Sequence, residues 1–195
     1  MFVFASVAGD ARWTASVLLA LEGVTLVLAV WTAGLARWSS RALIAMLTGT
    51  IILAIAQLVA GSERLSGITG LATGVLIVAT ITAIAVGVVD QSEVNARSIT
   101  GAVCIYVLFG LLFLFIYSAI ALLGSGPFFA QGTDGTRALR LYFSYVTLAT
   151  LGYGDYSAAG DLGHTVSVLE ALVGQLYLVT VLTLLVSRLR GASSD

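Results

Sequence analysis

The sequence predicts an all-α membrane protein with five transmembrane helices, a short re-entrant helix and an irregular loop. Of its 195 residues, 59% are hydrophobic and only 10% are charged, which is far more apolar than a soluble domain needs to bury a core. Five segments have the length of about 20 residues that a helix needs to cross a bilayer core of roughly 30 Å. Between the last two lies a polar, glycine-rich segment that is too short to span.

Short polar links separate the five predicted spans. The spans cover residues 13–35, 42–60, 68–89, 99–123 and 165–186, and the first three links are ARWSSR, GSERLSG and DQSEVNARS. No fixed-period repeat or low-complexity tract interrupts this order. The chain therefore divides into a three-helix N-terminal bundle over residues 1–97 and a second domain over residues 98–195.

The segment between the last two spans combines a loop with a short helix. The stretch GSGPFFAQGTDGT holds the only proline and four glycines, which is typical of an exposed loop. The following RALRLYFSYVTLA, residues 137–149, is too short to span and predicts a re-entrant helix. Thr136 or Asp134 is the expected N-cap, because either side chain can accept from free amides of the first turn.

The stretch TLATLGYGD then follows at residues 147–155. Gly152 and Gly154 can take left-handed conformations that other residues enter only at a cost. Alternating right- and left-handed residues aim successive carbonyl oxygens to one side, and four such strands form oxygen rings that replace the hydration shell of a cation. Irregular backbone at membrane depth is tolerated where it lines such a cavity or is buried in protein.

The run TLGYGD, preceded by a short helix and flanked by two spans, resembles the selectivity filter of tetrameric potassium channels. The order of outer helix, pore helix, filter and inner helix also matches that family over about half of the chain. The resemblance implies a homotetrameric, passive channel for potassium transport in membrane lipid. It implies no enzymatic activity and no cofactor other than potassium ions in the filter.

Carried over residue by residue, the resemblance implies a role for each filter position. The potassium-binding carbonyls and the glycine that completes the filter are Thr150, Leu151, Gly152, Tyr153 and Gly154. The side chain of Tyr153 is expected to hold the filter from behind, with Asp155 at the outer mouth. Some family members pair this aspartate with a carboxylate at the position of Val146, so the partner of Asp155 stays open.

The last span carries the expected gate. Gly174 stands where the family often has a hinge glycine, and the alternative is a glycine that allows close helix packing. Side chains that recur at steps of three and four residues are expected to face the central cavity. They are Gln175, Leu178, Leu182 and Val186.

Several polar side chains within or beside the spans allow two interpretations. Glu170 can hydrogen-bond hydroxyl groups behind the filter or be a protonated group satisfied in the bundle. Glu22 is expected to contact one of the last two spans. His164 is either a pH sensor or a polar helix end, and Arg137 and Arg140 either tune the outer mouth or form a solvated face.

Charge and cysteine content add limits. The net charge of −1 gives no attraction to nucleic acid. The span at 68–89 has no arginine, which excludes a charged voltage sensor. The single cysteine, Cys104, is expected to be a small buried side chain without a disulfide partner.

The resemblance also gives the topology. It implies a multi-pass protein of the cell membrane with its N-terminus outside and its C-terminus in the cytoplasm. The arginine distribution agrees with a weak positive-inside bias. The alternatives to a selective channel are a weakly selective cation channel and a membrane subunit of a potassium transport system.

Overall fold

The computed structural model describes residues 12–32, 63–89 and 96–192, with scattered residues between 45 and 59. The predicted span at 42–60 therefore lies largely outside the described residues. The helices of the described part, in chain order, are α2 Arg12–Thr32, α4 Glu63–Val89, α5 Ala96–Leu123, α6 Arg137–Leu148 and α7 Gly160–Ala192. The helix predicted over 137–149 is confirmed as α6.

Two helices begin earlier than the hydropathy pattern predicted. The polar segment expected to link the second and third spans is helical from Glu63 onwards. It contains no proline, and the Thr69 hydroxyl donates to the Leu65 carbonyl at 2.8 Å, so polar groups here are satisfied within the helix. Similarly, α7 begins at Gly160 and carries Asp161 in its first turn, where a negative charge interacts favourably with the helix dipole.

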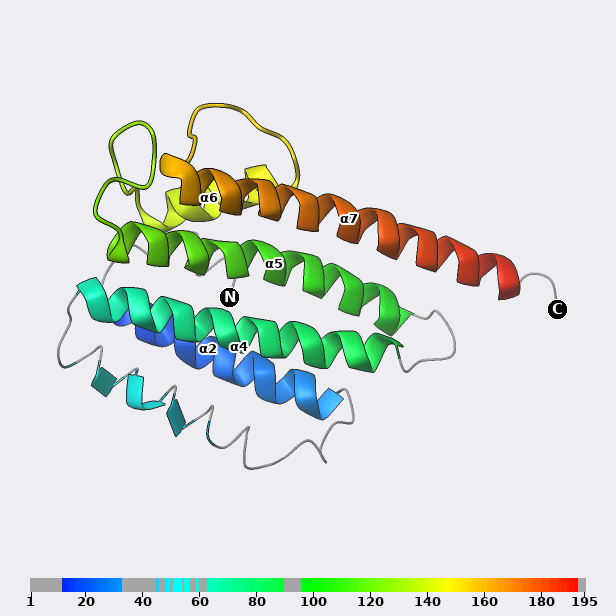
Figure 1. The fold of residues 1–195 in the computed structure, drawn as a ribbon. Helices are drawn as coiled ribbons and strands as arrows, with labels where there is room; N and C mark the ends of the chain where they lie inside the picture. The colour runs from blue at the N-terminus through cyan, green and yellow to red at the C-terminus, as the bar shows by residue number, and fades with distance from the viewer. Residues whose placement is uncertain are drawn as a thin grey trace.

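The long helices lie side by side with α5 in the middle (Figure 1). The helix α4 packs along one side of α5, and α2 packs against α4. On the other side, α6 and α7 both contact α5 and each other. The N-terminal helices are thus joined to the C-terminal domain chiefly through α5.

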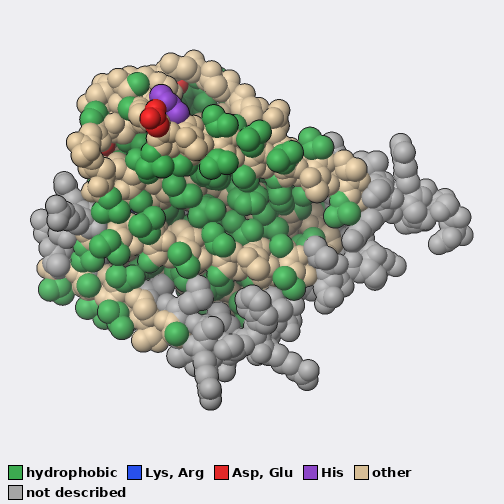
Figure 2. Space-filling model, in the orientation of Figure 1, with side chains coloured by type: hydrophobic (Ala, Val, Ile, Leu, Met, Phe, Trp, Pro, Cys, Tyr) green, Lys and Arg blue, Asp and Glu red, His purple; other side chains and the backbone are tan. Residues whose placement is uncertain are grey.

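Three described helices are long and apolar enough to cross a membrane. They are Leu65–Val88, Ser98–Leu123 and Gly160–Val181, while Ser16–Trp31 is a shorter apolar helix. Figure 2 shows hydrophobic side chains spread over the middle of the molecule. The expectation that Cys104 is buried is wrong, because its side chain is exposed on α5.

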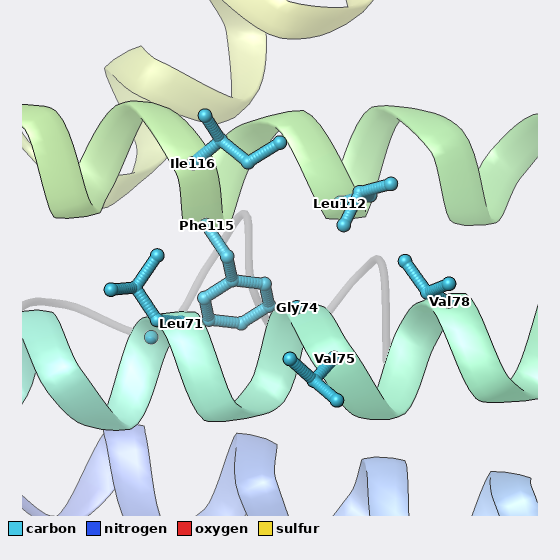
Figure 3. A pocket seen from close by; sticks show the side chains of 8 residues that line it. Leu71, Gly74, Val75, Val78, Leu112, Phe115 and Ile116 are labelled. Atoms are coloured by element: carbon cyan, nitrogen blue, oxygen red, sulfur yellow. The ribbon is translucent and has the colours of Figure 1, made fainter.

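An open groove between α4 and α5 shows how these two helices fit together (Figure 3). Gly70 of α4 lies next to Phe115 of α5, and Gly74 lies next to Leu112. All of its lining residues are apolar or glycine. The groove therefore offers no side-chain ligand for an ion.

One hydrophobic cluster lies where four helices meet. It joins α2, α4, α5 and α6 through the buried side chains of Leu18, Ile77, Leu108, Leu111, Leu114, Phe115 and Leu141. The N-terminal helices α2 and α4 thus contact the short helix α6 through this cluster. The Arg137 guanidinium of α6 also donates to the Thr14 hydroxyl of α2 at 2.6 Å.

The composition of the loop between α5 and α6 predicted an exposed segment, but part of this loop is buried. Phe128 and Phe129 are buried and pack with Phe143 and Tyr117 in an aromatic cluster. The Ala159 amide donates to the Phe128 carbonyl at 2.7 Å. These contacts fix the loop against the segment that follows the TLGYGD run.

Arg140 also departs from the predicted solvated face. Its side chain is only 5% exposed, and its guanidinium donates to the Ser118 hydroxyl at 3.0 Å and to the carbonyls of Asp134 and Gly135 at 2.8 Å. Five donors in a planar fork suit such a set of separate acceptors. Arg140 thereby fastens the start of α6 to α5 and to the preceding loop.

We expect Arg140→Leu to destabilise the protein by about 2–4 kcal/mol, because it leaves the buried Ser118 hydroxyl and two partly buried carbonyls without this donor. Thermal unfolding in detergent measures the loss. Arg140→Lys serves as the control, since it keeps the charge without the fork, and should give an intermediate value. An Arg140→Leu protein that unfolds at the wild-type temperature would show that these hydrogen bonds make no net contribution to stability.

Candidate functional site

The short helix α6 begins with a defined cap. The Thr136 hydroxyl accepts from the Leu139 amide at 3.2 Å, which decides between the two expected caps. The Asp134 carboxylate instead accepts from the Phe128 amide at 2.9 Å. Both groups therefore help to hold the loop that leads into the helix.

The backbone after α6 alternates in handedness. Thr150, Gly152 and Gly154 have φ angles of 54°, 56° and 78°, whereas Leu151 and Tyr153 between them are not left-handed. The left-handed conformation predicted for the two glycines is confirmed. Thr150 extends the alternation by one residue, which the glycine pattern alone could not indicate because a β-branched residue rarely adopts a positive φ.

This loop is open in a single chain. Leu151 is 57% exposed and Tyr153 is 65% exposed, and every residue from Ala149 to Asp155 is exposed. At its start, the amides of Thr150 and Leu151 donate to the Thr147 and Val146 carbonyls at 2.9 Å each. The loop is thus anchored to the end of α6 and presents the rest of its backbone outward.

The structure identifies a partner for Asp155. Its Oδ2 accepts from the Tyr142 hydroxyl at 2.8 Å, and the Tyr142 ring stacks on Tyr153 with centroids 6.3 Å apart. The bond to Asp155 raises the pKa of the Tyr142 phenol, which at its ordinary value of about 10 is already protonated at neutral pH. Tyr142 lies one helical turn before Val146, and neighbouring positions on that helix face were the signal that could have found it.

We expect Tyr142→Phe to lower ion flux by roughly fivefold, because it removes about 1 kcal/mol of hydrogen bonding while keeping the ring stack. Flux from liposomes measures this. Tyr156→Phe is the control, since it removes a phenol hydroxyl from the residue after Asp155 and keeps the bond from the Tyr156 amide to the Asp155 carboxylate. Equal flux from wild type and Tyr142→Phe would mean that the hydrogen bond does not support the conducting loop.

Gly174 of α7 lies against Leu148, the last residue of α6. A Cβ atom there would be 2.2 Å from the Leu148 carbonyl oxygen and 3.0 Å from a Leu148 methyl carbon. This contact is the close packing that the sequence left open as an alternative. A hinge at the same position stays a prediction.

The expected cavity-facing side chains are described only in part. Gln175 and Leu178 are exposed on α7. The side chains of Leu182 and Val186 lie outside the part of the chain that the structure describes. Their proposed place beside a central axis therefore stays a prediction.

Two acidic side chains, Glu22 and Glu170, are fully buried within helices. The Glu170 carboxyl lies 2.5 Å from the Tyr117 hydroxyl and 2.5 Å from the Ser144 hydroxyl, which agrees with the interpretation that it binds hydroxyl groups. Glu22 accepts from the Thr80 hydroxyl of α4 at 2.8 Å, so the expected contact with one of the last two spans is wrong. The reason is the packing order, since α2 lies against α4.

His164 lies on the first turns of α7 and is exposed. Its position agrees with a polar helix end. The alternative role as a pH sensor stays a prediction.

Comparisons with known proteins agree with this geometry. Residues 101–191 match the family model described as "Ion channel". The inward rectifier potassium channel Kirbac3.1 of Paramagnetospirillum magnetotacticum is 36% identical over 70 residues, which are 36% of this chain and 24% of that protein. The match thus covers about a quarter of that relative. No solved structure matches the chain.

The matched segment begins in α5 and ends in α7, so it contains α6 and the whole TLGYGD loop. The helices of the same segment include two that are long and apolar enough to span a membrane. The C-terminal half of this membrane protein is therefore similar to ion channels.

Proposed function

We propose that the protein is a passive, potassium-selective channel in the cell membrane, formed by four copies of this chain. Potassium ions bind to the carbonyl oxygens of Thr150, Leu151, Gly152 and Tyr153, and Gly154 completes the filter. The observation that carries the proposal is the left-handed backbone at every second residue from Thr150 to Gly154. This alternation turns successive carbonyls toward one side, as a dehydrated cation requires.

Four copies are proposed because one chain cannot surround an ion. The loop is exposed in a single chain, while irregular backbone at membrane depth needs a cavity or protein around it. In the most apolar window of α7 only 11% of residues are buried, compared with 44% in α5. In a ring of subunits in which α7 lines the pore, neighbouring chains would surround the exposed loop and pack against the exposed α7.

The proposed conduction needs only the chain and the ions. Potassium sheds water as it enters the carbonyl sites, and repulsion between adjacent ions moves them along the filter. The carbonyl end of α6 points its negative dipole toward the loop that follows it, which favours a cation there. The Asp155 carboxylate, held by Tyr142, adds negative charge at the outer mouth.

The proposed topology places the N-terminus outside and the C-terminus in the cytoplasm. Residues 1–97 form a bundle beside the pore domain at 98–195, Gly174 is the hinge of α7, and Gln175, Leu178, Leu182 and Val186 line the inner half of the pore. A weakly selective cation channel would use the same helices with fewer intact carbonyl sites. A transport subunit would need a partner that supplies energy.

Ion flux from liposomes that hold the purified protein tests the proposal. Under a potassium gradient we expect flux well above that of protein-free liposomes, and under a sodium gradient we expect flux close to background. Equal fluxes would favour the weakly selective channel. A purified complex with the mass of a single subunit would contradict the tetramer.

A further inference from the structure

The inference concerns Glu170, a fully buried side chain of α7 that joins three helices. Its Oε2 accepts from the Tyr117 hydroxyl of α5, and its Oε1 lies 2.5 Å from the Ser144 hydroxyl of α6. Neither contact brings a positive charge. An ionised carboxylate in this position would have hydroxyl partners alone, which is a costly arrangement within a membrane.

Counting hydrogens decides which group donates. The Ser144 hydroxyl lies 2.5 Å from Glu170 Oε1 and 2.8 Å from the Gly110 carbonyl oxygen, yet a hydroxyl carries only one hydrogen. If Ser144 donated to Glu170, the Ser144 hydroxyl oxygen and the Gly110 carbonyl oxygen would lie 2.8 Å apart without a hydrogen between them. If Glu170 carries a proton, it donates to Ser144, and Ser144 donates to Gly110.

The protonated form supplies one hydrogen to each contact of Glu170 and Ser144. Tyr117 donates to Glu170 Oε2, Glu170 donates to Ser144, and Ser144 donates to the Gly110 carbonyl. The Tyr117 ring is itself fully buried among Phe113, Phe128 and Phe143. Such surroundings leave the chain of hydrogen bonds without water as a substitute.

The register of α6 and α7 links the Glu170–Ser144 hydrogen bond to the position of the loop that follows α6. Glu170 and Gly174 lie one turn apart on α7, and their contacts on α6, Ser144 and Leu148, are also one turn apart. One face of α7 therefore follows one face of α6 over its last turns, directly before Thr150. Moving the Glu170 contact would shift the helix end from which the filter starts.

We infer that Glu170 is held as a neutral carboxylic acid and acts as a positioning residue that fixes α6, and with it the filter, from behind. This inference rests on the proposed function for its effect on selectivity, while the proton on Glu170 can be tested without any conduction.

The conservative variant Glu170→Gln tests the hydrogen-bond pattern. An amide nitrogen can donate to Ser144 while the amide oxygen accepts from Tyr117, so the variant should keep the wild-type ratio of potassium to sodium flux. Glu170→Ala should lower that ratio by roughly tenfold or more, because two buried hydroxyl groups lose a partner. Glu22→Ala is the matched control. It removes another buried carboxyl, whose hydrogen bond goes to Thr80 of α4, and should leave the ratio unchanged.

Infrared difference spectra between wild type and Glu170→Gln provide the second measurement. We expect the difference to contain the carbonyl stretch of a protonated carboxylic acid. Bands of an ionised carboxylate in its place would overturn the neutral form. An unchanged flux ratio in Glu170→Ala would overturn the positioning role, while absence of flux in the wild type would count against the proposed function and leave the infrared result valid.

Discussion

Replacing Gly152 with alanine is expected to abolish potassium-selective flux. The φ angle at Gly152 is 56°, and a Cβ added there would meet no atom within 4 Å, so the cost comes from the backbone conformation alone. A left-handed L-residue costs about 1–2 kcal/mol, and four copies raise this to about 4–8 kcal/mol in the proposed tetramer. Turning the peptide relieves the strain and removes carbonyls from the ion path.

The matched control for this variant is Gly132→Ala. Gly132 has a φ of 78° and equally open surroundings, but it lies in the loop between α5 and α6. Both variants place alanine at a positive φ, so a difference in flux between them reports the position of the strained residue in the chain. Selective flux that survives in Gly152→Ala would mean that this peptide does not contribute an ion site.

Replacing Gly174 with alanine is the second change with a large expected effect. The added Cβ would lie 2.2 Å from the Leu148 carbonyl oxygen, so α7 would have to move away from α6 by about 1.5 Å to reach ordinary contact. We expect a loss of about 1–3 kcal/mol in stability, despite the higher helix propensity of alanine. Because Leu148 ends α6 just before the filter, flux should fall as well.

Thermal unfolding in detergent together with liposome flux measures both effects. Gly70→Ala is the control, since the new methyl group would make an ordinary contact of 3.7 Å with Phe115. If Gly174 served only as a hinge, alanine would slow opening and leave the unfolding temperature at or above that of wild type. A lower unfolding temperature would favour close packing.

Local chemistry made parts of this structure predictable. The length of apolar segments placed α2, α4 and α5 within a few residues, and the capping chemistry of Thr136 marked the start of α6. Glycine at alternating positions predicted left-handed backbone at 152 and 154. Each of these predictions depends on residues that are neighbours in the sequence.

Contacts between residues that are distant in the sequence were harder to predict. The helices are hydrophobic nearly all round, so their composition does not tell which face meets which neighbour. This is why Glu22 was assigned to the wrong spans. The glycine and proline content of the loop after α5 predicted an exposed segment, so the burial of Phe128 and Phe129 was missed. The burial of Arg140 depends on carbonyls that only the folded loop brings together.

The pairing of Glu22 with Thr80 has a consequence for how the protein enters the membrane. An acidic residue near the middle of an isolated helix costs about 2.5–3.5 kcal/mol during insertion. The hydroxyl that offsets part of this cost stands 58 residues later in the chain. The first helix therefore gains its full stability in the bilayer only after α4 has been synthesised, which couples the insertion of the two helices during translation.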